Sequence, residues 1–372
     1  MSIKKTLFWA HLVLGCSAAL FIFLMSISGV ALTYERQMIQ AAQRADYPVA
    51  PSTQSQPLEM DEVVDFIENY HFKKTPQIQI SHEQSAPVVL KDGRRTVAYL
   101  NPYTGEKLDS LGEGTVTFFK KLRAFHRWLT FDGSFSETGS WVNGISNAFF
   151  LVLVISGIYL WFPQRFKARA FKQKLTLNGR YANSKARNYQ WHNVFGLYMA
   201  PILFVVVFTA LFFSFKWPGE ALKNFATSES PLFPSQLVLQ ELNVDTALPL
   251  AQQLDAVKQA FPQWQTIQFS LSNRNEGVSV YQVDYGNGGE PQKRFSVALN
   301  TSNANVLETQ SFEQLSDYRK VRSYIRFLHT GEIYGLVGQT LAGIASLLAC
   351  LLVYTGIMLS WTRWKNSRKK RD

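Results

Sequence analysis

Histidine is the residue type in this sequence with the clearest capacity for chemistry, because imidazole is a strong ligand for iron, copper and zinc. The chain has six histidines, and four of them lie at or near the ends of long apolar stretches. His11 and His192 open the first and third stretches, whereas His126 and His329 precede the second and fourth. A single histidine at such a place is more often an interfacial residue than a ligand. Two matched pairs favour a ligand role, and we interpret His71 and His82 as surface histidines.

Two histidines suit one particular cofactor. On opposite sides of a porphyrin they give a six-coordinate haem that transfers electrons. Zinc needs more ligands, and no cluster of Cys or His in the sequence supplies them. A Cys-x-x-Cys-His motif is absent from the sequence, which excludes covalent c-type attachment. The pairs His11/His192 and His126/His329 therefore suit two bis-histidine b-type haems better than any other common cofactor, and the spacing alone leaves a structural role as an equal alternative. The arginines that could pair with haem propionates are Arg123, Arg127, Arg322 and Arg326.

Four apolar stretches position these histidines. Each is long enough to cross a hydrocarbon core of ~30 Å at ~20 residues per crossing, and none has a charged residue in its central part. The first is longer than the ~7–15 apolar residues of a signal peptide, which favours a span there. We predict an integral membrane α-helical protein with four spans, at about Leu7–Tyr34, Trp141–Phe162, Trp191–Phe215 and Leu336–Trp361.

The location of the net charge of +11 predicts the orientation of the spans. The segment Arg165–Arg187 has eight Lys/Arg and no acid, and the tail Arg363–Asp372 has six Lys/Arg and one Asp. Basic residues concentrated beside spans mark the cytoplasmic side and argue against nucleic-acid binding. We predict a multi-pass protein of the bacterial inner membrane with both termini cytoplasmic. The predicted segments are the N-terminus with the first span (1–34), a periplasmic domain (35–138), the second span (139–163), a basic cytoplasmic loop (164–188), the third span (189–216), a second periplasmic domain (217–334), the fourth span (335–362) and a basic tail (363–372).

The two halves of the chain are related in sequence. The second and fourth spans align without gaps at an offset of 199 residues, and the first and third align at an offset of 181. Each half has the same direction, so we predict a parallel internal repeat. Each outer segment reads as a helix followed by strands, which predicts two small α+β domains. The predicted helices are Met60–Tyr70 and Leu254–Phe261, and the predicted strands are Gln77–Ser81, Val88–Lys91, Thr96–Leu100, Thr266–Leu271, Val278–Asp284 and Arg294–Leu299.

Several short motifs, in this order and spacing, resemble the PepSY-associated transmembrane family. They are His-Leu-Val-Leu-Gly at 11–15, Leu-Arg-Ala-Phe-His-Arg-Trp-Leu at 122–129, Trp-His-Asn-Val-Phe-Gly at 191–196 and Leu-His-Thr-Gly-Glu-Ile-Tyr-Gly at 328–335. The segment Tyr99–Leu108 resembles the last strand-turn-strand of a PepSY domain. The second outer domain has Asn300-Thr301-Ser302-Asn303 where the first has a Pro-Tyr-Thr-Gly turn.

The resemblance implies a function in iron uptake. The family includes haem-containing inner-membrane reductases of ferric siderophores. The resemblance therefore implies that the haem ligands are His11, His126, His192 and His329, which match the motifs of the family. We expect a haem-dependent oxidoreductase that passes electrons from a cytoplasmic or quinol donor to a ferric siderophore on the periplasmic side. The alternatives are a quinol-linked cytochrome that serves another periplasmic partner, and a non-redox protein whose anchored PepSY domains bind a peptide or peptidase.

Overall fold

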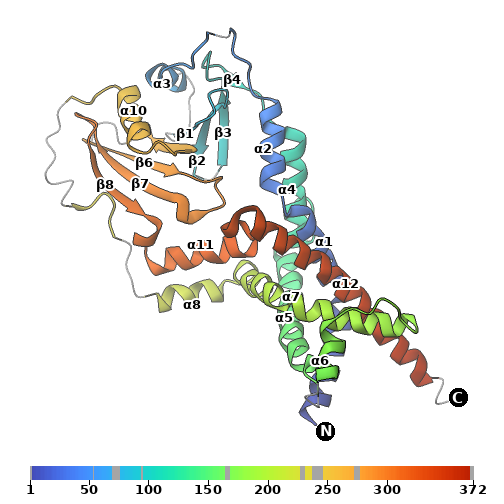
Figure 1. Cartoon of the computed structure of the whole chain (residues 1–372). Coiled ribbons are helices and arrows are strands. Elements are labelled where there is room, and N and C mark those ends of the chain that lie inside the picture. The colour runs from blue at the N-terminus through green and yellow to red at the C-terminus, as the bar shows by residue number, and fades with distance from the viewer. Residues whose placement is uncertain are drawn as a thin grey trace. The chain divides into compact units, whose positions relative to one another are not determined.

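The computed structural model describes residues 2–52, 54–68, 76–93, 95–163, 168–226, 231–236, 246–271 and 277–368, so His71 lies outside the described residues. The chain divides into two compact units (Figure 1). We call Met1–Glu35, Thr117–Phe225 and Tyr324–Asp372 the helical unit. Arg36–Val116 and Ala226–Ser323 are the sheet unit.

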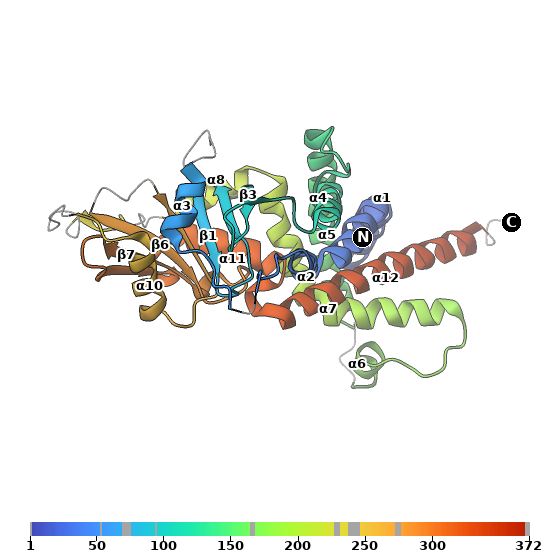
Figure 2. The same ribbon diagram turned by 90° about the horizontal axis from the view of Figure 1, so that it is seen from above.

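Four long helices form the frame of the helical unit: α1 (Ile3–Leu32), α5 (Ser136–Trp161), α7 (Ser184–Ser214) and α12 (Gly335–Arg368). Each is long and apolar enough to cross a membrane, which confirms the four predicted spans. They contact one another in the order α1, α5, α7, α12 and back to α1, so α1 and α7 are diagonal partners. Figure 2 shows α1 beside α12 in this arrangement.

Glycines allow two of these helix pairs to approach closely. A Cβ added at Gly144 of α5 would lie 2.8 Å from the ring of Phe215, which follows α7. A Cβ at Gly343 of α12 would lie 2.7 Å from the hydroxyl of Thr33, which follows α1. Any larger residue at either position would push the helices apart, as expected for small residues between membrane helices.

Shorter helices adjoin the long ones. Two of them carry a histidine at or near their C-terminus. Helix α4 (Glu113–Trp128) carries His126 and precedes α5, and α11 (Asp317–His329) ends at His329 and precedes α12. Both helices begin in the sheet unit and end in the helical unit. The others are α2 (Glu35–Ala45), α6 (Ala168–Leu175) and α8 (Trp217–Phe225).

The outer segments share one sheet, and this corrects the prediction of two separate α+β domains. Eight strands lie in the antiparallel order β4-β3-β2-β1-β5-β6-β7-β8. The halves join where β1 pairs with β5, with Gln79 opposite Gln268. Pairing these strands removes two open sheet edges, which separate domains would leave exposed. The strands are β1 (Gln77–Ser81), β2 (Val88–Asp92), β3 (Arg95–Leu100), β4 (Lys107–Leu108), β5 (Thr266–Ser270), β6 (Val278–Asp284), β7 (Arg294–Asn300) and β8 (Val306–Ser311).

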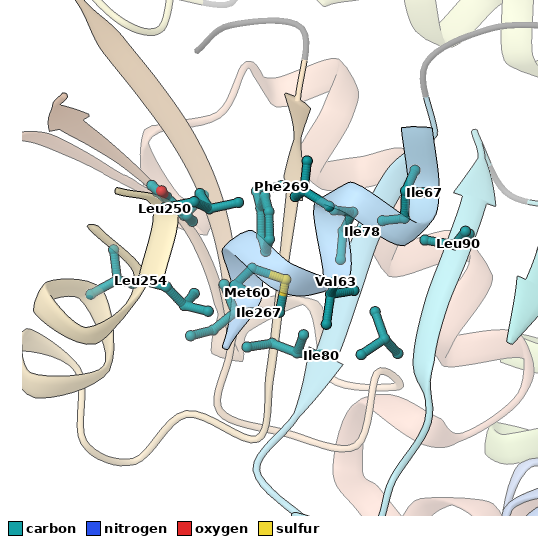
Figure 3. Packing of buried hydrophobic residues seen from close by; sticks show 14 of the residues in the cluster. Met60, Val63, Ile67, Ile78, Ile80, Leu90, Leu250, Leu254, Ile267 and Phe269 are labelled. Carbon is teal, nitrogen blue, oxygen red and sulfur yellow. The ribbon is translucent and has the colours of Figure 1, made fainter. Parts of the chain in front are cut away.

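One hydrophobic core serves both halves of the sheet. Helices α3 (Met60–Glu68) and α10 (Leu250–Ala260) place buried residues such as Val63 and Leu254 against one face (Figure 3). Alternate strand residues such as Ile78 and Ile267 meet them and are fully buried. This alternation is the period-2 pattern that identified the strands in the sequence.

The opposite halves of the sheet contain the same turn. After β3, Gly105 N–H donates to Asn101 O and Asn101 Oδ1 accepts from Tyr103 N–H. After β7, Ala304 N–H donates to Asn300 O and Asn300 Oδ1 accepts from Ser302 N–H. Both turns need a positive φ, +71° at Gly105 and +57° at Ala304. The second turn therefore keeps the geometry of the first without its glycine.

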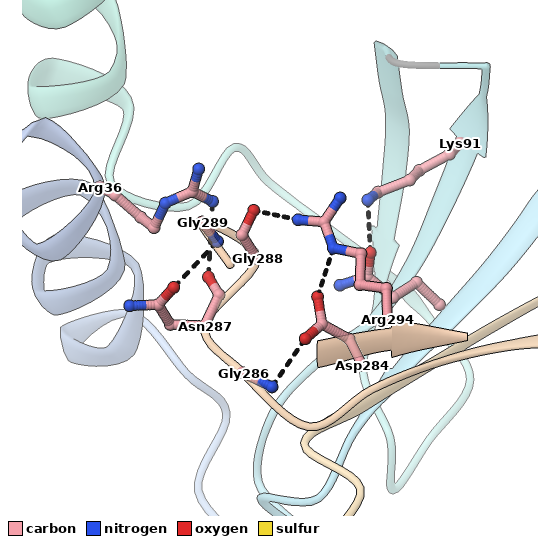
Figure 4. Close-up of polar contacts among 9 residues, drawn as sticks. Arg36, Lys91, Asp284, Gly286, Asn287, Gly288, Gly289 and Arg294 are labelled. Carbon is pink, nitrogen blue, oxygen red and sulfur yellow. Dashed lines mark hydrogen bonds and ion pairs between the residues drawn. The ribbon is translucent and has the colours of Figure 1, made fainter. Parts of the chain in front are cut away.

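The connection between β6 and β7 is fixed by polar contacts (Figure 4). Asp284 pairs with Arg294 at 2.7 Å and also accepts from Gly286 N–H. Arg36 of α2 donates to Asn287 O. On the neighbouring strands, Lys91 of β2 donates to Gln79 of β1. Burial and the positive charge of Arg294 lower the pKa of Lys91.

Candidate functional site

The four predicted ligands form two pairs inside the helical unit. His11 of α1 and His192 of α7 face each other across the diagonal of the bundle, with ring centres 6.4 Å apart. His126 of α4 and His329 of α11 form the second pair, with ring centres 6.5 Å apart. The structure thus brings together the same partners that the sequence paired.

Each ring of the first pair is held by a hydroxyl on a neighbouring span. His11 Nδ1 lies 2.9 Å from Ser156 Oγ on α5. His192 Nδ1 lies 2.9 Å from Thr355 Oγ1 on α12. Both hydroxyl residues are buried. Every imidazole in this pair is therefore oriented by a helix other than its own.

Each ring of the second pair is also held by a hydroxyl on another helix. Here α1 and α7 supply the hydroxyls, whereas in the first pair they carry the histidines. His126 Nδ1 lies 2.9 Å from Ser28 Oγ on α1, and His329 Nδ1 lies 3.2 Å from Thr209 Oγ1 on α7. Asn143 of α5 also donates to the carbonyl of His126 at 2.8 Å, which fixes the end of α4. These hydrogen bonds link α4 and α11, which lie outside the spans, to the ends of α1, α5 and α7.

The hydrogen bonds define which ring nitrogen carries the proton. Each hydroxyl donates to a carbonyl one turn earlier in its own helix, for example Ser156 to Val152 O at 2.6 Å and Ser28 to Leu24 O at 2.6 Å. A hydroxyl whose proton is used in this way can only accept, so Nδ1 of the histidine must donate. His329 supports this directly, because its Nδ1 also lies 2.9 Å from Val206 O, which cannot donate. We therefore assign all four rings as Nδ1–H tautomers with a free lone pair on Nε2.

The rings of the second pair are neutral near pH 7. His126 and His329 lie on helices outside the four spans. Burial lowers the pKa of His126 to about 4, and the nearby His329 ring adds to this effect. Burial likewise lowers the pKa of His329. A neutral imidazole with its Nδ1 proton engaged is the form that ligates a metal through Nε2.

The spacing of each pair fits one metal ion between two rings. An imidazole nitrogen lies about 1.1 Å from its ring centre and about 2.0 Å from a metal that it ligates, so two rings on opposite sides of one ion have centres about 6.2 Å apart. The observed 6.4 Å and 6.5 Å agree with that separation. Among the described residues no group of three or more His, Cys, Asp or Glu could hold a metal ion. Haem needs only two protein ligands, so this donor set suits haem better than a bare ion.

Glycines leave room beside three of the four rings. A Cβ added at Gly157 would lie 3.5 Å from His11 Cε1, and one at Gly356 would lie 3.4 Å from His192 Cε1. A Cβ at Gly29 would lie 3.6 Å from His126 Cε1. Each glycine therefore lets its helix backbone approach the Cε1 edge of one ring at ordinary van der Waals distance.

The four arginines named for the propionates have varied surroundings. Arg123 pairs with Glu35 at 2.6 Å. Arg127 stacks over Trp128, and Arg326 stacks over Phe327. Arg322 donates to the hydroxyl of Tyr318. Their pairing with propionates stays a prediction.

Sequence reasoning missed the roles of Ser28, Ser156, Thr209 and Thr355. The signal was present in the repeat: Ser28 lies 17 residues after His11, and Thr209 lies 17 residues after His192. Ser156 and Thr355 likewise match at the offset of 199. A hydroxyl at corresponding places in paired apolar spans could have indicated partners for the histidines.

Comparison with known proteins bears on the whole arrangement. No curated protein gives a sequence match. The family model described as the PepSY-associated TM region matches residues 8–363, which include both histidine pairs and all four long helices. The chain is therefore a membrane protein that belongs to the PepSY-associated transmembrane family, as its motifs predicted.

Proposed function

We propose that this protein is a di-haem b-type electron-transfer protein of the bacterial inner membrane that reduces ferric siderophores. His11 and His192 hold one haem, and His126 and His329 hold the other. Haem supplies a one-electron Fe(III)/Fe(II) couple at each position. The protein's own residues supply the ligands, their orientation and the exclusion of water.

The observation that carries this proposal is the recurrence of one arrangement at all four histidines. In every case Nδ1 is bonded to a buried hydroxyl that itself donates to a helix carbonyl. A structural histidine needs a partner, but four rings in two pairs, each spaced for one metal ion, are not required for packing. Second-shell hydrogen bonds of this kind orient a ligand and raise its basicity.

The two pairs lie at opposite ends of the spans. Seventeen residues separate His11 from Ser28, the partner of His126, and the same number separate His192 from Thr209, the partner of His329. In a helix this corresponds to about 25 Å, close to the ~30 Å of a hydrocarbon core. The charge distribution orients the His11–His192 pair towards the cytoplasm and the sheet unit towards the periplasm.

Electron transfer in this orientation runs from the cytoplasmic side to the periplasm. An electron that moves outward across an inside-negative membrane gains ~2.3 kcal/mol per 100 mV. A quinol donor would release two electrons and two protons and so reduce two ferric ions to ferrous ions. Ferrous iron binds hard oxygen ligands less strongly, so the siderophore would release it.

Optical spectroscopy of the purified protein tests the proposal. A Soret band that shifts on addition of dithionite, followed by reoxidation on addition of a ferric siderophore, is the expected result. A haem protein that a ferric siderophore fails to reoxidise would favour a cytochrome that serves another periplasmic partner. A colourless protein expressed with adequate haem would contradict the proposal and favour a non-redox role for the sheet unit.

A further inference from the structure

The two helices that carry the His126–His329 pair have an unusual charge. Helix α4 has four Lys/Arg and one Glu, and α11 has four Lys/Arg and one Asp. The basic residues occupy corresponding positions at the offset of 199. They are Lys120, Lys121, Arg123 and Arg127 on α4, and Arg319, Lys320, Arg322 and Arg326 on α11. We call α4 and α11 the basic helices.

Most of this charge is exposed. All of these side chains except Lys320 are exposed, and Lys320 pairs with the acid of its own helix, Asp317, at 3.1 Å. Arg123 remains half-exposed although it pairs with Glu35. Lys120 and Arg319 enter no ion pair with any described residue. Each basic helix therefore presents a net positive surface to solvent.

Two other helices next to spans provide an internal control. Helix α2 follows α1 and has two Arg and one Glu, and α8 follows α7 and has one Lys and one Glu. If the charge served contacts with lipid headgroups, all four helices beside the spans on the predicted periplasmic side (α2, α4, α8 and α11) would be expected to carry it. Of these four helices, only α4 and α11 do so. Helix α6 is also basic, but it lies in the predicted cytoplasmic loop, where the positive-inside pattern accounts for its charge. The charge is thus associated with the His126–His329 pair rather than with the membrane boundary in general.

Membrane topology does not account for this charge. Basic residues beside spans favour the cytoplasmic side, so eight of them on the opposite side oppose the usual rule. Basic residues on that side need another role, and a cluster of positive charge next to a redox centre suits an anionic substrate. In helical rise, Lys120 lies about 9 Å from His126 and Arg319 about 15 Å from His329. These distances are comparable to the screening length of ~10 Å at 0.1 M salt.

We propose that the basic helices recruit a soluble ferric chelate with oxygen donors and a net negative charge to the His126–His329 pair. This inference rests on the proposed function and specifies its substrate class. The helices attract the chelate by charge, and one electron then reduces its Fe(III) to Fe(II). Such steering raises association rates by 10- to 1,000-fold and weakens as salt rises.

The test compares two chelates and two variants by stopped-flow reoxidation of the dithionite-reduced, haem-loaded full-length protein. The probes are ferric citrate, which is anionic, and a neutral ferric trihydroxamate. Lys120→Glu combined with Arg319→Glu reverses two exposed charges of the basic helices. Lys223→Glu combined with Arg95→Glu reverses two exposed charges elsewhere and serves as the control. Each rate is divided by the wild-type rate for the same chelate, so differences in chelate potential cancel.

The expected result is a reduction of about tenfold or more in the ferric citrate rate for the first variant at low salt. The neutral chelate and the control variant should change less than twofold, and 0.5 M salt should remove the difference. Equal changes for both chelates, or no change for either, would overturn this inference while leaving the proposed function intact. A wild-type haem protein that neither chelate reoxidises would instead overturn the proposed function.

Discussion

The two halves of the chain hold their histidine rings with hydroxyls from different residue types. In the first half the hydroxyls that hold the imidazoles belong to serines, Ser28 and Ser156, and in the second half they belong to threonines, Thr209 and Thr355. His11 and His192 occupy corresponding positions at the offset of 181. His126 and His329 do not, because they are displaced by one helical turn at the offset of 199.

This comparison shows which feature of the histidine sites is the same in both halves and which features differ. The hydroxyl contacts the imidazole in every case. The hydroxyl comes from serine or threonine, and the histidines of the second pair do not align between the halves. The constraint is therefore on the hydrogen bond between Nδ1 and the hydroxyl, not on alignment between the halves. The parallel internal repeat itself stays a prediction.

The largest expected effect follows from removing one histidine of a pair. Each pair takes one ligand from each half, so His11→Ala and His192→Ala should abolish the same haem and leave the other. The haem content should fall from two to one per chain in both variants, measured by pyridine haemochrome absorbance. His82→Ala is the matched control, because His82 lies beside Trp264 in the sheet unit. Unequal losses in the two variants would show that the halves do not contribute equally.

A smaller effect is expected at the glycines beside the rings. Gly157→Leu and Gly356→Leu should each weaken haem binding at the His11–His192 pair by tenfold or more, because the larger side chain would press on the Cε1 edge of the imidazole and displace the ring. Gly157→Ala and Gly356→Ala should retain haem, since the added Cβ would make ordinary contacts of 3.5 Å and 3.4 Å. Haem titration followed at the Soret band distinguishes these outcomes. Normal affinity in both leucine variants would contradict the role given to the glycines.

The turns of the sheet unit offer a comparison of stability between the halves. Ala304 has a φ of +57°, a conformation that costs a non-glycine residue roughly 1–2 kcal/mol. Ala304→Gly should therefore stabilise the β7–β8 hairpin by about 1 kcal/mol. Gly105→Ala should destabilise the β3–β4 hairpin by more than its backbone strain alone, because its Cβ would lie 2.2 Å from the Phe66 ring.

Hydrogen–deuterium exchange of the full-length protein measures both changes locally. A gain of about 1 kcal/mol slows exchange through local opening by about fivefold. Peptides from β7–β8 should respond to Ala304→Gly, and peptides from β3–β4 should respond to Gly105→Ala. Unchanged exchange at β7–β8 would mean that the second turn bears no strain relative to the first.

The turns also show how far the sequence could predict the fold. Periodicity and β-branched residues placed β1 and β6 at their observed bounds, and burial alternates along β1 as that pattern predicts. It did not reveal β4, which has only two residues. It also gave no indication that β1 pairs with β5, because that contact joins residues almost 190 positions apart. Loss of the Pro-Tyr-Thr-Gly motif suggested a different second turn, yet the Asn300 side chain maintains the same hydrogen bonds.

The candidate site could be predicted to a similar extent. Charge distribution and span order sorted the four histidines into their observed pairs. The hydroxyl partners could not be assigned, because serine and threonine are common in membrane helices and usually bond only to their own backbone. Identifying Ser156 as the partner of His11 required the contact between α5 and α1. That contact depends on side-chain direction, which sequence spacing alone does not specify.

The finest comparison between the halves concerns the hydroxyls of the His11–His192 pair. Ser156→Ala and Thr355→Val each remove the acceptor of one Nδ1 proton. The imidazole then becomes a weaker electron donor to the metal and stabilises ferric haem less, so the midpoint potential should rise. A hydrogen bond contributes about 1 kcal/mol, and 59 mV corresponds to a tenfold change for one electron, so the rise should not exceed about 40 mV.

Potentiometric titration at the Soret band measures this shift. The exchange variants Ser156→Thr and Thr355→Ser retain the hydroxyl and should leave the potential unchanged, although they give each half the residue of the other. A shift in the exchange variants as large as in Ser156→Ala and Thr355→Val would show that side-chain volume, not the hydroxyl, sets the potential. Equal rises in the two deletion variants, with none in the exchanges, would establish that serine and threonine perform one role in the two halves.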